Sequence, residues 1–426
     1  MTPISRRRAS CQRQSGAATL VVALLLSFAM TLVVAYANRN LVYEHKASAN
    51  QYRSTQAFEA AEAGLEWALA QINSNASVGD DCRPSAAAGS TSFRERYLAY
   101  DAATERHTPR TWSNAGNSVA LAPSCVRTDS GWSCSCPSAG QPQLAAPAGA
   151  GAHPAFSLQF IAAGRSSIVH LAATGCDALA GACVPGGNAA GAATARVHFS
   201  LGLVPALATP PAAPLTARGS VALGAEIGVH NTDPAASGIT VDAGNSITLP
   251  LAHLGTAPGS PLGASLIDHD ASLAALDAKA MFGTFLGLDK ARWRQQPGAQ
   301  TITCPADCTA ELSRALGQGT RLLWVRNDLR LDGDTAIGSP ERPVLLVVEG
   351  QVQLSGGVVI HGLVYVAAPQ WDSSASNNAL VRGALIAEGN VAGNGTPELF
   401  YDAAVLARLR SNAGTFTRVA GSWRDF

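Results

Sequence analysis

Nine cysteines are the residues of this sequence whose chemistry is easiest to place: Cys11, Cys82, Cys125, Cys134, Cys136, Cys176, Cys183, Cys304 and Cys308. Cys176 and Cys183 form one short local pair that a disulfide could close, and Cys304 and Cys308 form another. The four cysteines from 82 to 136 would then pair among themselves, with three possible connectivities. A zinc site is the alternative. The chain lacks a CxxC motif and its histidines are scattered without ligand spacing, so we expect disulfides and no metal.

Carboxylates in the C-terminal half raise the question of catalysis. Glu349 and Glu388 occupy matching Glu-Gly positions of two similar segments, so they could align on one face. Paired carboxylates of this kind act as general acid and base in polysaccharide-cleaving enzymes. Equivalent turn-flanking acids recur in solenoid proteins without catalytic activity, where Glu-Gly is most simply a solvated turn. Because no other nucleophile arrangement or phosphate loop accompanies them, we expect no enzyme and no cofactor.

Two further acidic groups invite a binding or catalytic interpretation. Asp328, Asp332 and Asp334 could contribute to a calcium site, but a full EF-hand loop and its terminal bidentate Glu are missing, so a turn is expected. Asp268-His269-Asp270 directly precedes a helical pattern. Asp270 is therefore expected to cap that helix rather than to orient a catalytic histidine.

An apolar run near the N-terminus is expected to anchor the rest of the chain. The run Ala17–Ala37 follows Arg6, Arg7, Arg8 and Arg13, and it precedes the first acidic residue, Glu44. It is long enough to cross a bilayer as one helix, with the basic flank in the cytoplasm and the body outside. A cleaved secretory signal and an uncleaved signal anchor are two interpretations.

The third interpretation is a type IV prepilin leader. Gly16 followed by Ala17, Ala18, Thr19 and Leu20 resembles the Gly-Phe-Thr-Leu start of that class. The resemblance implies that prepilin peptidase removes residues 1–16 and that Ala17, or Ala18 if cleavage is shifted by one residue, becomes the N-terminus. Removal of Cys11 with the leader would leave eight cysteines, an even number.

The helical pattern continues beyond the apolar run. Between Asn50 and Ile72 there is one glycine, Gly64, and no proline, and apolar residues recur at helical spacing. One helix is therefore expected over residues 17–75, with an apolar first half and an amphipathic second half. The part from residue 17 to residue 73 would be about 85 Å long. Within it, Ala57, Phe58, Ala61, Glu62 and Leu65 belong to the segment AFEAAEAGL, which resembles the N-terminal region of PilX-type minor pilins.

One position departs from the usual pilin pattern. Most pilins carry a glutamate at the fifth residue of the mature chain, where Val21 stands here. A carboxylate buried among apolar helices is costly unless it is paired. Family resemblance implies that the same glutamate is absent from PilX and from GspK, the large minor pseudopilin of type II secretion, both placed near a filament tip. Val21 therefore favours a tip or priming subunit over a major pilin.

Composition bounds the body of the protein. The chain has 426 residues, a formal net charge of +0 and only 14% charged residues, with no basic patch outside the leader. We expect no nucleic-acid binding. Residues 76–205 hold turn-formers, cysteines and short β-branched strands, which predicts a disulfide-bonded β-rich domain. An Ala/Pro-rich linker is expected at 206–216.

The C-terminal half contains a faint repeat. Similar segments begin at Leu322, Leu345, Leu363 and Ala384, and each is a short apolar strand followed by a polar or glycine turn. A period of about 20 residues predicts the coils of a parallel β-helix over 217–426, with a helical insert at 266–318. The alternative is a β-sandwich with coincidental spacing. The segment Glu398–Arg410 is expected to cap the open end of the solenoid.

The expected fold class is thus α+β: a long pilin-like helix, a small disulfide-bonded head and a β-solenoid. The PilX resemblance implies a minor pilin that assembles or primes a type IV pilus at or near its tip. It implies an inner-membrane single pass with a periplasmic body, later incorporation into the extracellular pilus, and partners among major and minor pilins, prepilin peptidase, the assembly platform and a PilY-type tip adhesin. Two alternatives are a GspK-like pseudopilin and a membrane-anchored β-helix adhesin or glycan-binding protein. The adhesin predicts an exposed row of aromatics, for which Trp324, Tyr365, Trp371, Phe400 and Tyr401 are the candidates.

Overall fold

A computed structural model describes residues 16–145, 147–148, 153–179, 183, 192–224, 226–233, 236–304 and 306–425. The expected leader arginines and Cys11 lie outside these residues. The chain divides into two compact units after Gln56, and each unit is described by itself.

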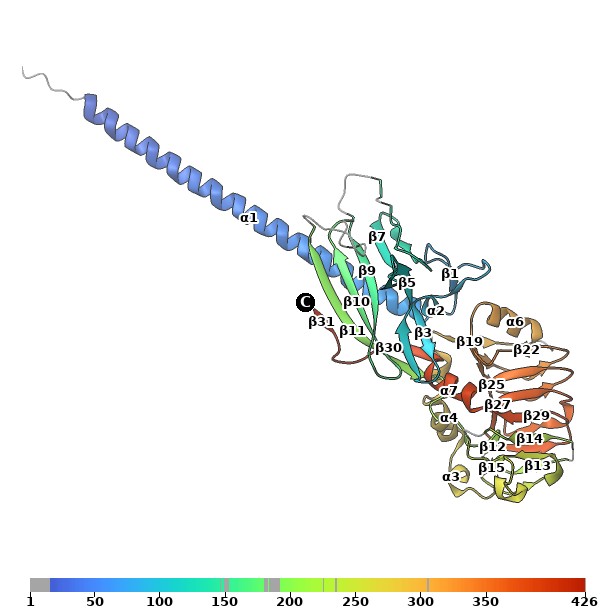
Figure 1. The fold of residues 1–426 in the computed structure, drawn as a ribbon. Coiled ribbons are helices and arrows are strands. Elements are labelled where there is room, and N and C mark those ends of the chain that lie inside the picture. The colour runs from blue at the N-terminus through green and yellow to red at the C-terminus, as the bar shows by residue number, and fades with distance from the viewer. Residues whose placement is uncertain are drawn as a thin grey trace, which may run out of the picture. The chain divides into compact units, whose positions relative to one another are not determined.

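The first element is a single long helix, α1, which runs from Gly16 to Ile72 (Figure 1). No proline interrupts it, and Gly64 is the one glycine between its first residue and its end. At its C-terminus the Asn73 side chain donates to the carbonyl of Leu69 at 3.0 Å, which satisfies a terminal carbonyl of the helix. The prediction of one uninterrupted helix is confirmed.

A disulfide-bonded head follows α1. Its central antiparallel sheet has the order β30-β11-β10-β9-β7-β8. Apolar residues alternate along its strands and point to one core, as Val197, Phe199 and Leu201 do on β11. The elements of the head before the solenoid are β1 Ser77–Val78, β2 Thr91–Ser92, α2 Phe93–Tyr97, β3 Leu98–Asp101, β4 Arg106–Pro109, β5 Thr111–Asn114, β6 Asn117–Ala120, β7 Ser124–Thr128, β8 Gly131–Ser135, β9 Ala155–Ala162, β10 Ile168–Cys176 and β11 Thr194–Pro205.

The C-terminal half is a solenoid of parallel strands. Leu322 pairs with Leu345, Leu345 with Leu363, and Leu363 with Ala384, so the starts of the sequence repeat stack coil on coil. The parallel pairing confirms the β-helix and excludes the sandwich. Its strands are β12 Leu215–Ala217, β13 Val221–Leu223, β14 Gly228–Asn231, β15 Val241–Ala243, β16 Ile247–Thr248, β17 Leu254–Thr256, β18 Leu266–Ile267, β19 Ala299–Ile302, β20 Leu322–Val325, β21 Leu329–Leu331, β22 Ala336–Ile337, β23 Val344–Val348, β24 Val352–Leu354, β25 Val359–Val366, β26 Gln370–Asp372, β27 Leu380–Ala387, β28 Asn390–Gly393 and β29 Glu398–Tyr401.

The coils do not stack in chain order. Strand β12, near the start of the solenoid, pairs with β27 of a late coil and with β15 of the next early coil. The main sheet therefore runs β17-β14-β29-β27-β25-β23-β20-β19. The chain builds the coils at one end first, passes through a helical segment and resumes at β19, at the other end.

Helices cover the outer face of the main solenoid sheet and one end of its stack. They are α3 Ala271–Ala274, α4 Ala278–Leu286, α5 Lys290–Arg294, α6 Thr309–Gly317 and α7 Ala403–Ser411. Because α4, α5 and α7 cover this face, both faces of strands such as β20 and β23 are buried. This burial explains why those strands are continuous apolar runs rather than alternating ones.

The expectation that Glu398–Arg410 caps the open end is wrong. Strand β29 lies inside the sheet between β14 and β27, and α7 packs beside the strands near it. The early coils extend the stack beyond β29, so no open end is left there. At the β19 end, α6 instead places Leu312 and Ala315 in the solenoid core.

The end of the chain returns to the head. Strand β30, Gly414–Arg418, pairs with β11 as an edge strand, and β31, Arg424–Asp425, also pairs with β11. Pro205 lies opposite Gly414, and the Ala206 amide donates to the Ala413 carbonyl at 3.0 Å. The solenoid is therefore inserted between two neighbouring strands of the head sheet. The sequence predicts a solenoid that extends over residues 217–426. The structure differs, because β30 and β31 at the end of this range complete the head sheet.

The segment expected as a linker is packed. Ala206, Leu207 and Ala213 are fully buried, and Leu215 already belongs to β12. Four disulfides join the described cysteines: Cys82–Cys136, Cys125–Cys134, Cys176–Cys183 and Cys304–Cys308. Of the three connectivities left open for the head, the structure has the one that closes the β7–β8 hairpin.

Candidate functional site: the N-terminal helix and the head–solenoid cleft

The first part of α1 is apolar on all sides. Val21 has 55% of its surface exposed and Leu25 has 64%, and the other large apolar side chains up to Tyr36 are similarly exposed. The helix over Ala18–Ile72 is long and apolar enough to cross a membrane. A helix that is apolar all round requires an apolar environment, either lipid or other helices. Val21 and Ala37 both lie on this helix.

The second part of α1 packs on the head sheet through small residues. Ala57, Ala61 and Ala68 are fully buried, and Leu65 is 1% exposed. A Cβ added to Gly175 of β10 would lie 2.0 Å from the Ala57 carbonyl oxygen, and one added to Gly64 would lie 2.9 Å from the Phe156 ring. Only small residues allow this backbone approach. The AFEAAEAGL segment is therefore the surface by which the helix contacts the head.

The remaining residues of that segment face outward or sideways. Phe58 is half-buried and makes an edge-to-face contact with Trp423, with ring centroids 6.2 Å apart. Glu62 is exposed, as is Glu66, which forms an ion pair with Arg418 of β30. Of the predicted motif residues, Ala57, Ala61 and Leu65 thus lie together against the sheet, whereas Glu62 lies on the free face of the helix.

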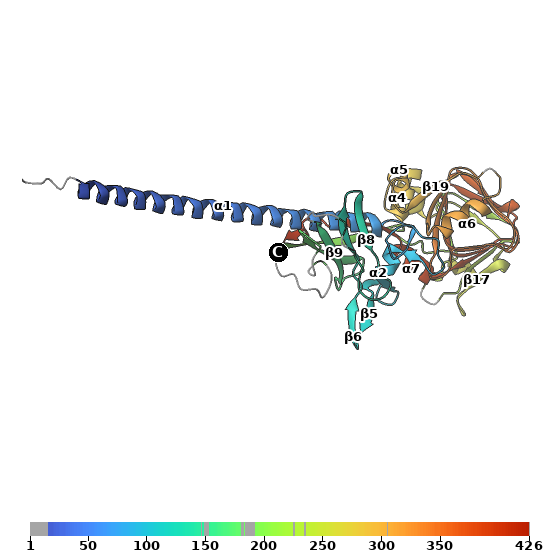
Figure 2. The ribbon, with the colours of Figure 1, turned by 90° about the horizontal axis from the view of Figure 1, so that it is seen from above.

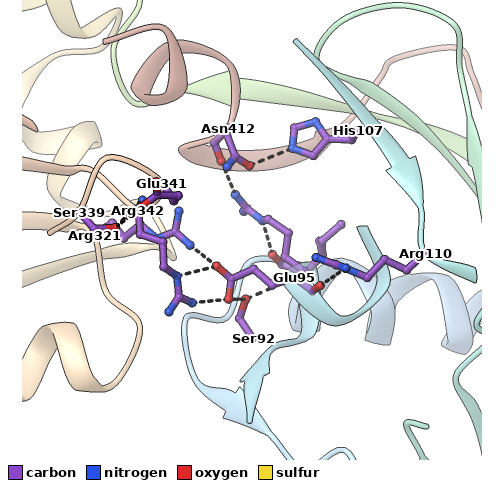
Figure 3. Close-up of polar contacts among 11 residues, drawn as sticks. Ser92, Glu95, His107, Arg110, Arg321, Ser339, Glu341, Arg342 and Asn412 are labelled. Atoms are coloured by element: carbon purple, nitrogen blue, oxygen red, sulfur yellow. Dashed lines mark hydrogen bonds and ion pairs between the residues drawn. The ribbon is translucent and has the colours of Figure 1, made fainter. Parts of the chain in front are cut away.

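A polar cluster joins the head to the solenoid (Figure 3). Glu95 of α2 accepts from Arg321, at the start of β20, and from Arg342, which donates through Nε at 3.0 Å and also through Nη2. Burial alone would raise the pKa of Glu95. The two guanidinium groups outweigh that effect and hold the pKa of this carboxyl below its ordinary value.

Arg94, the residue before Glu95, joins its own helix α2 to two other segments of the chain, the end of α1 and the residues after α7. Its guanidinium donates to the carbonyls of Ile72 at 3.1 Å, Asn412 at 3.3 Å and Gly414 at 2.9 Å. Ile72 ends α1 and Asn412 follows α7, so the cation lies at the negative ends of two helix dipoles. Burial, followed by the neighbouring Arg321, lowers the pKa of Arg94 to about 10.

These residues line a cleft of about 910 Å³ between the head and the solenoid. Its lining includes Arg94, Arg96, Arg110, Arg321, Arg342 and Arg408, with Glu95 and Glu341 as the carboxylates. The sequence alone does not reveal this site. Its arginines lie far apart in the sequence, in segments read as loops, turns or helix ends, so only the fold brings them together.

The carboxylates considered for catalysis hold the helical segment on the solenoid. Glu388 is 4% exposed and accepts from Lys290 Nζ at 2.7 Å and from the Tyr365 hydroxyl at 2.9 Å. Glu349 accepts from Trp324 Nε1 at 2.8 Å, and Arg294 Nη1 lies 3.7 Å from it. Lys290 and Arg294 are one helical turn apart on α5.

The remaining acidic candidates have structural roles. Asp328 accepts from the Gln351 amide of the next coil at 2.9 Å, and Asp332 accepts from the adjacent Gly333 amide at 2.8 Å within a turn. Asp270 caps α3 by accepting from the amides of Ser272 and Leu273. Among the residues that the structure describes, no group of three or more His, Cys, Asp or Glu side chains could hold a metal ion.

A comparison with known protein families finds a match for most of helix α1. Residues 15–66 match the PilX N-terminal family. The N-terminal segment is therefore of the PilX type. This match confirms the resemblance seen in AFEAAEAGL, and with the apolar helix it fits a membrane-anchored, pilin-related protein. The PilX-type segment covers a small part of the 426 residues, and the solenoid lies outside it.

No curated protein matches the sequence. Among solved structures, the competence-associated pilin ComZ from Thermus thermophilus is similar at 11% identity, over 88% of this chain and 98% of that chain, with a TM-score of 0.24. A TM-score of that size does not establish a shared fold.

Proposed function

We propose that this protein is a minor pilin of a type IV pilus that assembles or primes the filament at or near its tip. The observation that carries the proposal is the PilX-type segment itself, an apolar helix whose second half is docked on a globular head by AFEAAEAGL. The role is assembly, and no chemical step is required of the protein.

Assembly would move the apolar half of α1 from lipid into a bundle of other pilin helices. Both environments are apolar, so the exposed side chains from Leu20 to Tyr36 lose little on transfer. Val21 brings no carboxylate to pair with a neighbouring N-terminus. Together with the large body outside the PilX-type segment, Val21 favours one copy at or near the tip over many copies along the shaft.

The proposed topology is an inner-membrane single pass with the basic leader in the cytoplasm and the body in the periplasm, followed by incorporation into the pilus. Four disulfides suit an oxidising compartment. The proposed partners are prepilin peptidase, the assembly platform, other pilins and a PilY-type tip adhesin.

The two alternatives receive less support. An anchored glycan-binding solenoid requires exposed aromatics, but Trp324, Tyr365 and Trp371 are 2%, 0% and 1% exposed. Phe400 and Tyr401 are half-buried. A GspK-like pseudopilin is expected to carry a mainly α/β head, whereas this chain carries a parallel solenoid.

Determination of the mature N-terminus by mass spectrometry, in cells with and without prepilin peptidase, tests the proposal. We expect a peptidase-dependent start at Ala17, with an N-methyl group, and loss of processing when Gly16 is replaced by Glu. A substitution one turn into the apolar run, Val22→Leu, serves as the control and should be processed normally. An intact leader, or cleavage beyond Ala37, would contradict the pilin assignment.

A further inference from the structure

We propose that the cleft between the head and the solenoid binds an acidic peptide segment, one that presents two or more carboxylates to the arginines of its walls. This inference does not depend on the pilin assignment. It rests on the charge of the cleft, on the hydrogen bonds that its arginines already make, and on its position between two substructures.

The charge of the cleft is strongly unbalanced. Six arginines and two glutamates line it, in a protein whose formal net charge is +0. Arg96 is neutralised by Asp80 at 2.7 Å, and Arg321 and Arg342 share Glu95. Within the described part of the chain, Arg110 and Arg408 have no carboxylate at ion-pair distance. A concave surface with excess positive charge concentrates anionic ligands.

The bonds of Arg110 and Arg408 leave donors available. Arg110 is exposed and donates through Nε to the Glu95 carbonyl at 2.7 Å. Arg408 donates through Nη1 to the Pro340 carbonyl at 2.9 Å. Each contact fixes the side chain but does not neutralise it. A guanidinium held by one carbonyl is preorganised to donate its other N–H groups to a carboxylate.

Glu95 indicates the group that this cleft accepts. Its carboxylate lies between two arginines of the solenoid and receives a two-point contact from Arg342 (Figure 3). A ligand carboxylate would make a two-point contact with the two Nη groups of Arg110, whose Nε already donates to the Glu95 carbonyl, or with Nε and Nη2 of Arg408. Binding sites often occur between domains, and a volume of about 910 Å³ holds several residues.

A peptide fits better than an acidic glycan. Sugar rings are commonly held on an open aromatic face, and the aromatic rings of this cleft are occupied. Tyr100 packs on His107 with centroids 5.4 Å apart and bonds to Ser411 through its hydroxyl, and His107 is 2% exposed. The cleft therefore offers charge and hydrogen-bond donors rather than a stacking platform.

Calorimetric titration of the full chain, purified in detergent at low salt, with acetylated hexaglutamate tests the proposal. We expect saturable binding, about tenfold weaker when salt is raised from about 50 to about 300 mM, and no binding of hexalysine. The double variant Arg110→Gln, Arg408→Gln should weaken binding about tenfold or more. The control, Arg292→Gln with Arg330→Gln, removes the same charge from exposed positions outside the cleft lining and should change the affinity less than twofold.

A second pair of variants separates the cleft from general surface charge. Glu95→Gln releases the guanidinium groups of Arg321 and Arg342 and should tighten hexaglutamate binding several-fold. Glu341 pairs with neither of these arginines, so Glu341→Gln should tighten hexaglutamate binding less. Equal affinity in the Arg110/Arg408 variant and in its control would overturn the proposal. Tighter binding of oligogalacturonate than of hexaglutamate, with loss in the same variant, would overturn the peptide assignment.

Discussion

One pair of carboxylates in the solenoid, Asp242 and Asp270, combines charge with burial. Asp242 on β15 lies next to Asp270, the cap of α3. Burial, together with the charge and hydrogen bond of Asp270, raises the pKa of Asp242 to about 6. An acid whose pKa is raised by folding favours the folded state at low pH, and that contribution is lost as pH rises through the folded pKa.

Replacement of Asp242 by Asn should therefore stabilise the protein near pH 8, because the neutral amide avoids repulsion by Asp270. The gain should be about 1 kcal/mol, allowing for partial solvent screening. It should shrink below about pH 5, where the wild-type carboxyl is protonated. Urea unfolding followed by tryptophan fluorescence from pH 4 to pH 8 measures the difference, and a gain that stays constant across that range would contradict the prediction.

Two elements show how close packing follows from residue size. Helix α1 approaches β9 and β10 through alanines and Gly64, and β10 contributes Gly175 to the same contact. In the solenoid, stacked glycines have a similar role. Gly362 and Gly383 pair in register, and a Cβ on Gly383, at φ +136°, would lie 2.0 Å from the Gly362 carbonyl.

Replacement of Gly175 by Ala should push α1 away from the sheet, because its Cβ would overlap the Ala57 carbonyl. We expect a loss of about 1–3 kcal/mol in stability. Gly283→Ala in α4 is the matched control. A Cβ there meets no atom within 4 Å, and the change should be neutral or stabilising by up to about 1 kcal/mol. Thermal unfolding of both variants checks this, and equal melting temperatures would count against the close-approach argument.

At the scale of the whole molecule, the head is completed only after the solenoid has been made. Phe416 of β30 is 1% exposed in the head core, and its backbone exchanges two hydrogen bonds of 2.8 Å with Asn73, just after α1. Figure 2 shows α7 next to the head, where the chain returns from the solenoid. The neighbouring strands β11 and β30 are thus separated in the sequence by the whole solenoid.

Deletion of residues 414–426 should expose β11 while leaving every solenoid strand in place. We expect amide hydrogens of Val197–Leu203 to exchange faster by at least about tenfold, since their edge partner and Phe416 are gone. Those of β23 and β25 should be unchanged. Hydrogen exchange read by mass spectrometry tests this, and unchanged protection of β11 would show that the returning strand is dispensable.

Local patterns predicted much of this structure. The apolar run and the helical spacing of AFEAAEAGL are patterns within one helix, and both appeared as expected. The starts at Leu322, Leu345, Leu363 and Ala384 are a pattern between consecutive coils, and they stack as expected. The stacking of β12 on β27, the return of β30 to β11 and the arginine cleft join residues far apart in sequence. The residues of a short strand do not show which distant strand will pair with it. For this reason neither the long-range strand pairs nor the cleft that they create could be predicted from the sequence.

The paired crossing points at Ala206 and Ala413 have a consequence for how such a protein can change. Because the chain leaves and re-enters the head at adjacent positions, the coils at the β17 end of the solenoid could be changed without altering the strands of the head. Coils added at β17 and β18 would leave the contacts of Arg321 and Arg342 with Glu95 untouched. The reach of the body could thus be lengthened in steps of about 4.8 Å per coil, while the helix that anchors it stays the same.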